Sequence, residues 1–325
     1  MKCPRIIEIK SEIGAGTRGA SLGIDALKIA SLKKNDNFFY HCPTYEVRTF
    51  NESLFEKTPY LKAKRIDYLL KTLQNVSDAV SQSLLAEDFP IILAGDHSTA
   101  AGTIAGIKKT MPNKRLGVIW IDAHADLHSP YTTPSGNMHG MPLAMALAED
   151  NLDAKINDVD EKTEQYWHYI KSLGVAGAKL RSSDIVFIAL RDTEAQEDYL
   201  IEKYQMPIYT VEHIRKKGIK ASVQEILEDK LKDCDLLYVS FDVDSLDEHI
   251  SVGTGTPVAD GLSVEEATLI NQLLMEDDRI VAWEMVEINP TLDNKGNVMA
   301  ETAFDILKIC VNSLNQQVSK EAIEV

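Results

Sequence analysis

The chain has 325 residues, 44% of them hydrophobic, and it carries 34 Lys plus Arg against 50 Asp plus Glu, a formal net charge of −16. This length and apolar content suffice to bury one large hydrophobic core. The acidic surplus repels nucleic acid and anionic lipid, so we expect neither nucleic acid nor a membrane as a partner and expect a cationic or neutral small molecule instead.

The N-terminal segment and the cysteines bear on the compartment. The first residues lack the apolar stretch and small-residue cleavage site of a signal peptide, and no run approaches the roughly 18 apolar residues of a membrane span. The cysteines include no C-x-x-C pair, which is typical of reduced thiols. These features predict a cytoplasmic protein without a redox role. The cysteines are Cys3, Cys42, Cys234 and Cys310.

Short apolar runs rich in Ile, Val, Leu and aromatic residues recur along the chain. Several are too continuous for a half-exposed antiparallel strand, so they indicate buried parallel strands. In chain order they are residues 5–9, 89–95, 115–122, 184–190, 206–211, 235–244 and 279–289.

Amphipathic segments separate these runs. Residues 62–85 and 219–233 place apolar side chains three and four apart, which predicts helices, and residues 300–325 predict a C-terminal helix. The polar residues 149–165 predict a surface insertion or loop. Alternating strands and helices predict an α/β fold with three α/β/α layers and a central, mostly parallel sheet. Because no repeat or linker divides the chain, we expect a single domain over residues 1–325.

Polar side chains follow several of the apolar runs at the point where each run ends. In parallel α/β sheets ligands bind beyond the carboxyl ends of the strands, so a functional site is expected there. The period-two spacing of D-x-H-x-D and D-x-D directs alternate side chains the same way. The residues are Asp96 and His97 after the second run, Asp122, His124 and Asp126 after the third, Asp242 and Asp244 at the end of the sixth, and Glu287 in the seventh.

Each of these groups alone also has an ordinary structural explanation. His97 stands where a helix would begin, and the Asp-x-Asp pair fits turn chemistry. The D-A-H-A-D group is harder to explain in this way, because crowding carboxylates and imidazoles without a counter-charge is costly. Together, two imidazoles and four aspartates from three strand ends predict a two-metal site, in which four carboxylates balance two divalent cations.

The ligand types also indicate the metal. Oxygen-rich sites with an occasional imidazole suit Mn²⁺, with Co²⁺, Ni²⁺ and Fe²⁺ as alternatives, and the absence of thiolates disfavours a closed structural zinc site. Two such ions about 3.5–4 Å apart can share a water and lower its pKa, which supplies a nucleophile at neutral pH. The sequence therefore predicts a hydrolase.

Six segments together carry a resemblance to a known family. They are AGDHS (94–98), DAHAD (122–126), SGNMHG (135–140), SFDVDSLD (240–247), GTGTP (253–257) and EINP (287–290). In this order and approximate spacing they resemble the ureohydrolase family, and within it the arginases, over essentially the whole chain. The resemblance implies one α/β domain with a parallel sheet of about eight strands and hydrolysis of a guanidinium group to urea and an amine.

The resemblance also implies two Mn²⁺ per subunit and a role for each ligand. One ion would be held by His97, Asp122, Asp126 and Asp242, and the other by His124, Asp122, Asp242 and Asp244. Asp126 would also bind the bridging hydroxide and relay a proton, and Glu287 would pair with the guanidinium group. His139 would be the proton shuttle, a role that suits an imidazole. The ordinary alternatives are a helix cap for His139 and a turn before Pro290 for Glu287.

The same resemblance assigns the other end of the substrate. Ser135 and Asn137, helped by Thr133, would read the α-carboxylate of arginine, and Thr256 would line the cleft. Glu194 and Glu197 would receive the α-amino group. His128 stands where arginases usually carry Asn, and it would either donate to the carboxylate or be a spectator on its loop. Glu194 stands in place of an Asp, and the SLDEHIS segment lacks the usual Pro.

These assignments favour L-arginine, giving L-ornithine and urea, because agmatine has no α-carboxylate. Agmatine, guanidinobutyrate and formimidoylglutamate remain alternative substrates, and a catalytically silent metal-binding assembly module is an alternative of another class. Family members usually form homo-oligomers, trimers or hexamers. The segment 300–325 ends without the extended tail that links subunits in some arginases, so we expect assembly through another surface.

Overall fold

The computed structural model describes residues 3–294 and 296–321. Within them, eight strands form one sheet in the order β2-β1-β3-β8-β7-β4-β5-β6, and every neighbouring pair is parallel. The predicted α/β fold class is therefore confirmed. The strands are β1 (Cys3–Ile9), β2 (Thr44–Glu46), β3 (Asp88–Ala94), β4 (Leu116–Ile121), β5 (Ile185–Ile188), β6 (Ile208–Tyr209), β7 (Leu236–Asp242) and β8 (Ile280–Val286).

Seven of these strands coincide with the predicted apolar runs, and β2 was not predicted. Its three residues, Thr44–Glu46, are all exposed, so they carry no apolar pattern that could mark a strand. By contrast, all residues of β4 and β7 are buried, because helices cover both faces of the sheet.

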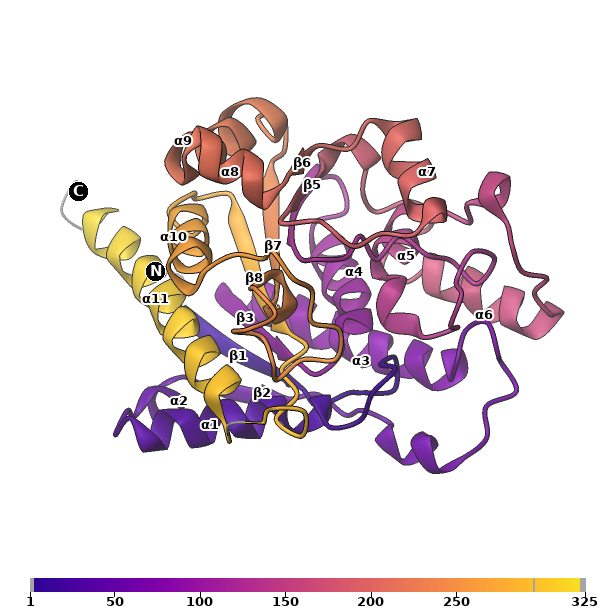
Figure 1. Ribbon diagram of the computed structural model, residues 1–325, viewed down its shortest axis with the longest axis horizontal. Helices are drawn as coiled ribbons and strands as arrows, with labels where there is room; N and C mark the ends of the chain where they lie inside the picture. The colour runs from indigo at the N-terminus through magenta and orange to yellow at the C-terminus, as the bar shows by residue number, and fades with distance from the viewer. Residues whose placement is uncertain (1–2, 295, 322–325) are drawn as a thin grey trace.

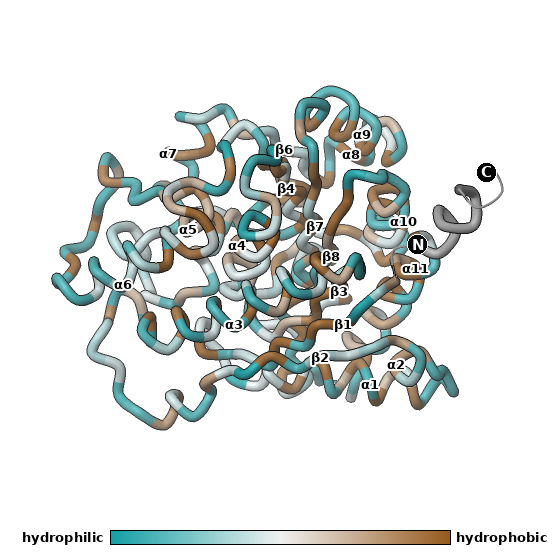
Figure 2. The backbone as a smooth tube through the Cα atoms, turned by 180° about the vertical axis from the view of Figure 1, so that it is seen from behind, coloured by the Kyte–Doolittle hydropathy of each residue, from teal (hydrophilic) through white to brown (hydrophobic). Residues whose placement is uncertain are grey.

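The helices lie in two layers on either side of the sheet (Figure 1). Successive side chains of a strand point to opposite faces, so Ile6 packs with one layer and Ile7 with the other. On the first face lie Ile24 of α1 (Gly23–Lys33), Ile270 of α10 (Val264–Leu274) and Phe304 of α11 (Val298–Glu321). On the second face lie Val76 of α3 (Ile66–Leu85), Ile104 of α4 (Ala100–Thr110) and Leu200 of α7 (Ala195–Tyr204). Figure 2 shows hydrophobic residues on strands such as β1 and, interspersed with polar ones, along the helices.

The helix bounds follow the predicted amphipathic segments closely. Residues 219–233 form α9 and a π-helical turn over Ile226–Lys230. None of the helices in the described part of the chain is long and apolar enough to cross a membrane. The helices are α1 (Gly23–Lys33), α2 (Phe38–His41), α3 (Ile66–Leu85), α4 (Ala100–Thr110), α5 (Pro142–Leu147), α6 (Glu161–Lys171), α7 (Ala195–Tyr204), α8 (Val211–Lys217), α9 (Ile219–Glu225), α10 (Val264–Leu274) and α11 (Val298–Glu321).

Two predictions about helices need comment. The surface loop predicted for residues 149–165 is wrong from Glu161 onward, where α6 begins. Asp160 caps this helix by accepting a hydrogen bond from the Thr163 amide, and Trp167 and Ile170 are buried in a core cluster shared with α3. Trp167 and Ile170, which mark the apolar face of this helix, lie after the polar segment 149–165, so the segment alone gave no helical pattern. The expected C-terminal helix begins at Val298, but residues 322–325, and with them the predicted absence of a tail, lie outside the described residues.

The sheet order decides where the polar strand ends meet. Strands β3, β8, β7 and β4 are consecutive neighbours at the centre of the sheet. Because all four run in the same direction, the residues that follow them gather at one edge. The motifs D-H, E-I-N-P, D-x-D and D-x-H-x-D lie at the carboxyl ends of these four strands, in that order.

Candidate metal centre

His97 lies at the centre of one group of candidate ligands. Its Nδ1 atom is 3.0 Å from Asp122 Oδ2, 3.1 Å from Asp126 Oδ2 and 3.2 Å from Asp242 Oδ2. All four side chains are buried. One nitrogen and three carboxylate oxygens thus face one point, as the ligands of a hard divalent cation do.

His124 lies at the centre of a second group next to the first. Its Nδ1 atom is 3.1 Å from Asp244 Oδ2 and 3.5 Å from Asp122 Oδ1. Asp122 therefore belongs to both groups, one oxygen to each. The second oxygen of Asp242 accepts a hydrogen bond from the Asp244 amide at 2.8 Å, so Asp242 faces the first group with one oxygen only.

The local backbone aims these side chains. Asp122 follows β4 directly, and its Oδ1 accepts a hydrogen bond from the His124 amide at 2.7 Å, which turns the chain away from strand geometry. Asp126 and Glu287 have positive φ angles of 53° and 67°. Residues other than glycine hold this conformation only where the surroundings impose it, and such positions cluster at functional sites.

The buried charges of the two groups shift one another's pKa values. Burial lowers the pKa of His97, but its three carboxylate neighbours outweigh burial and raise that pKa well above its usual value. Burial and the charges of Asp244 and Asp122 raise the pKa of Asp242. Buried carboxylates crowded in this way favour a bound positive charge.

Two atoms of the first group also lack a hydrogen-bond partner within the described residues, although both are fully buried. They are His97 Nδ1 and Asp122 Oδ2. Buried polar atoms without a partner are rare in native structures, and a nitrogen and a carboxylate oxygen left in this way suit a bound cation. The residues present therefore fit a divalent cation in each group.

A layer of residues behind His97 holds its ring, and sequence reasoning missed it. His97 Nε2 lies 2.8 Å from Ser240 Oγ, and the ring stacks on Trp120 with centroids 4.0 Å apart. Ser240 lies two residues before Asp242 in β7 and so points to the same face. A lone hydroxyl in the apolar run LLYVSFD was the available signal.

His139 and Glu287 meet on the other side of His97. His139 Nδ1 is 3.3 Å from Glu287 Oε1, and the same oxygen accepts a hydrogen bond from the His97 amide at 3.0 Å. Burial lowers the pKa of His139, but the Glu287 carboxylate outweighs burial and raises it to about 9. The imidazole and the carboxylate predicted for proton transfer and guanidinium binding are thus neighbours.

The residues expected at the far end of the substrate fall into two sets. In one set, His128 Nε2 is 2.8 Å from Glu194 Oε2 and 3.7 Å from Glu197 Oε2, so His128 is tied to both acids. Both oxygens of Glu197 accept backbone hydrogen bonds, from Leu127 and from Glu194, and the second of these belongs to the capping box that begins α7. Glu194 is half exposed and is the acid open to solvent.

The second set lines the loop before His139. Ser135 Oγ accepts a hydrogen bond from the Asn137 amide at 3.1 Å, and Thr133 Oγ1 accepts one from Gly136 at 2.9 Å. Thr256 instead donates to Asp244 Oδ2 at 3.0 Å, so it contacts a candidate metal ligand directly.

Two further residues that sequence reasoning missed support the centre from β5. Asp192 Oδ2 lies 3.6 Å from His124 Nε2, on the side of the ring away from the carboxylates. The guanidinium group of Arg191 donates to the carbonyl groups of Asp244, Leu246 and Val258, which fixes the loop after β7. Both residues directly follow the β5 run, but no spacing motif marked them.

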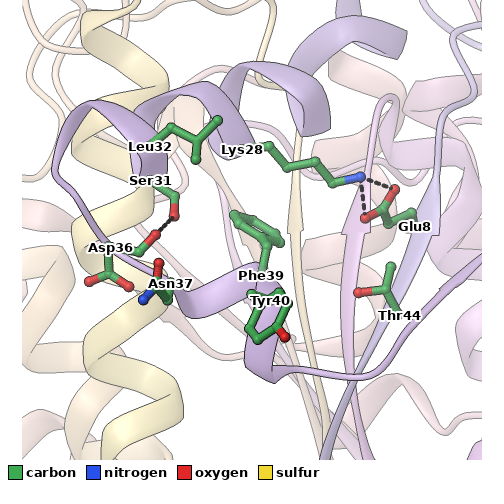
Figure 3. A pocket seen from close by; sticks show the side chains of 9 residues that line it. All are labelled: Glu8, Lys28, Ser31, Leu32, Asp36, Asn37, Phe39, Tyr40 and Thr44. Atoms are coloured by element: carbon green, nitrogen blue, oxygen red, sulfur yellow. Dashed lines mark hydrogen bonds and ion pairs between the residues drawn. The ribbon is translucent and has the colours of Figure 1, made fainter.

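A separate pocket of about 430 Å³ lies between α1, α2 and the strands β1 and β2 (Figure 3). The Lys28 ammonium at its base is paired with Glu8 at 2.7 Å, and Asp36 is paired with Lys308. Its charged groups therefore neutralise one another, unlike those of the metal centre.

Comparisons with known proteins agree with this geometry. The family model described as "Arginase family" matches residues 5–311. An arginase of Brevibacillus brevis is 31% identical over 314 residues, covering 93% of this chain and 95% of the relative, and an arginase of Bacillus subtilis is 32% identical over 304 residues with the same coverage. The crystal structure of an arginase from Bacillus caldovelox superposes with a TM-score of 0.82 at 29% identity, covering 95% of this chain and 98% of that one.

Proposed function

This chain belongs to the arginase family, and from that premise we propose that it hydrolyses L-arginine to L-ornithine and urea. The observation that carries the proposal is the convergence of His97, Asp122 and Asp242 in one group with Asp122, His124 and Asp244 in the next. The shared carboxylate of Asp122 places two cation sites side by side.

We assign two Mn²⁺ to these groups, in keeping with their oxygen-rich ligands. The ligands would be His97, Asp122, Asp126, Asp242, His124 and Asp244. Divalent cations held there would supply a water of lowered pKa, which is the chemistry that attack on a guanidinium carbon requires. Calorimetric titration with Mn²⁺, Co²⁺, Ni²⁺ and Fe²⁺ would measure the number of sites and the preferred metal.

Three residues of this chain would handle charge and protons around the guanidinium group. Glu287 would bind its positive charge, because a charge-assisted hydrogen bond is strong in a buried site. His139, 3.3 Å from Glu287, would carry a proton between solvent and the leaving amine. Asp126, which faces His97 at 3.1 Å, would accept the proton that the attacking water gives up.

The far end of the cleft favours an amino acid over a simple amine. Ser135, Thr133 and Asn137 offer donors that suit a carboxylate, and Glu194 offers an exposed carboxylate that suits an ammonium group. Because His128 is bound to Glu194, we propose that it orients this acid.

The test is turnover by the Mn²⁺-loaded protein. Urea release from arginine, agmatine and guanidinobutyrate, and formamide release from formimidoylglutamate, would be compared under one set of conditions. We expect arginine to give the highest kcat/KM. A higher value for agmatine would reject the arginine assignment, and no turnover of any of them would favour a silent metal-binding module.

Three further properties remain proposals. A single domain is supported by the sheet, in which β1, β3 and β8 are neighbours although they come from opposite ends of the chain. A homo-oligomer, trimer or hexamer, would be tested by analytical ultracentrifugation. A cytoplasmic location is supported by the four free thiols, and cell fractionation would test it.

A further inference from the structure

The loops around the metal centre carry opposite charges on its two sides. In the sheet order, β1 lies on one side of the strands that bear the candidate ligands and β5 lies on the other. Arg18 follows β1, and its guanidinium group donates to the carbonyl groups of Glu12 and Ala15 rather than to a carboxylate. Asp192 and Glu194 follow β5 and are largely open to solvent. A molecule bound beside the metal centre therefore meets cations towards β1 and anions towards β5.

Lys64 places one of these cations directly on the substrate loop. Its Nζ atom donates a hydrogen bond to Asn137 Oδ1 at 2.9 Å, and its backbone amide donates to Gly136 at 2.8 Å. Within the described ranges 3–294 and 296–321, no carboxylate forms an ion pair with this ammonium group. Its charge is thus not neutralised by the protein around it.

The contact between Lys64 and Asn137 also fixes which way the Asn137 amide points. An ammonium group can only donate hydrogen bonds, so its partner in the Asn137 side chain must be the carbonyl oxygen. The NH₂ group must then face the other way, towards Gly16, where a Cβ atom would stand 2.7 Å from Asn137 Nδ2. No acceptor in the described part of the chain takes a hydrogen bond from that NH₂ group, so it is free to donate.

We propose that Lys64 is a positioning residue that selects guanidino substrates carrying a carboxylate. By holding the Asn137 oxygen, it aims the Asn137 NH₂ group at the substrate carboxylate and adds a positive charge behind it. Arginine satisfies this requirement and agmatine does not. The inference rests on the proposed function and adds a residue that the family motifs do not contain.

The test uses Lys64→Met, which keeps an unbranched side chain of nearly the same length and removes the donor. On Mn²⁺-loaded protein, we expect KM for arginine to rise about tenfold, as for loss of one charge-assisted contact, with kcat within about twofold. KM for agmatine should not move. Lys64→Arg, which keeps a charged donor, should restore most of the affinity for arginine. Lys62→Met is the matched control, because Lys62 lies two residues away and makes no hydrogen bond to Asn137.

A double-mutant cycle separates positioning from a general effect on the loop. If Lys64 acts through Asn137, Lys64→Met should change KM for arginine less than about twofold in an Asn137→Ala background. Calorimetric binding of ornithine and putrescine gives the same comparison without turnover, because ornithine has the carboxylate and putrescine lacks it. The Lys64→Met variant should lose about tenfold in affinity for ornithine only.

Two outcomes would overturn the inference: an unchanged KM for arginine in Lys64→Met, or an equal rise for arginine and agmatine. Failure of the proposed function looks different, because the wild-type protein would then hydrolyse no arginine. The ornithine titration still tests Lys64 in that case, and equal affinities for ornithine in the wild type and in Lys64→Met would reject it.

Discussion

The hydrogen bond between Ser240 and His97 fixes which ring nitrogen of His97 faces a cation, so Ser240→Ala tests the metal centre. His97 Nδ1 faces three carboxylates, so this nitrogen must be unprotonated to bind a metal. The ring proton then lies on Nε2, which donates to Ser240 Oγ at 2.8 Å. Both residues are fully buried, so removing the hydroxyl leaves a buried N–H without a partner.

The expected cost follows from this geometry. An unsatisfied buried donor costs about 1–3 kcal/mol, which lowers the melting temperature of the metal-free protein by several degrees. Loss of the residue that orients a ligating histidine typically lowers metal affinity ~10–100-fold. Thermal unfolding of the metal-free protein and competition titration with Mn²⁺ would measure the two effects.

A matched control distinguishes a specific effect from a general loss of stability. Ser222 in α9 is equally buried, but its hydroxyl donates to the carbonyl of Gly218, the residue before α9, away from the metal centre. Ser222→Ala should lower stability without changing Mn²⁺ affinity. If Ser240→Ala binds Mn²⁺ as tightly as the wild type does, the assignment of Ser240 as the support of His97 is wrong.

Four further predictions concern the metal, the shuttle residue His139, in two experiments, and the substrate loop. Chelation should lower the melting temperature, because a ligand at 100 times its Kd contributes about 2.7 kcal/mol per site; equal melting curves with and without chelator would contradict the metal centre. His139→Asn should lower kcat roughly a hundredfold or more at unchanged manganese content, and lost manganese would instead make His139 a ligand or a structural residue. The pKa of His139 is raised to about 9, above its usual 6.5, so the stability that protonated His139 contributes is complete below pH 6.5 and is lost as the pH rises to 9. In urea titrations of the metal-free proteins, the free energy of unfolding should therefore fall less between pH 6.5 and 9 for His139→Asn than for the wild type. Gly136→Ala should raise KM for arginine and lower stability by about 1–3 kcal/mol, because Gly136 has φ 76° and a Cβ atom would stand 2.0 Å from the Leu61 carbonyl; unchanged KM would show that this loop does not bind substrate.

The strands and the candidate ligands were predictable because their signals are local. A buried parallel strand is a continuous apolar run, and seven of the eight described strands were found in this way. D-x-H-x-D and D-x-D can be recognised in the sequence because candidate metal ligands recur at every second residue, which is the period of a strand. Strand β2 and helix α6 escaped prediction because the first is fully exposed and the second begins inside a polar segment.

Contacts between distant segments were not predictable. His128 was left open between a carboxylate donor and a spectator, and the fold ties it to Glu194, 66 positions away. Ser240, Asp192 and Lys64 each carry an ordinary residue type with no motif around it. The roles of these three residues depend on their contacts with His97, His124 and Asn137, respectively, which lie 143, 68 and 73 positions away along the chain.

The amino-acid sequence by itself determined the α/β alternation, the edge of the sheet at which a site had to lie and the six side chains expected to bind cations. Each of these follows from hydrophobic periodicity or from spacing within a few residues. The tertiary structure alone decided which oxygen of Asp122 faces each group, which hydroxyl holds the His97 ring and which lysine faces Asn137. Those pairings depend on the order of strands in the sheet and on how loops from different strands pack, and short-range sequence patterns do not encode either.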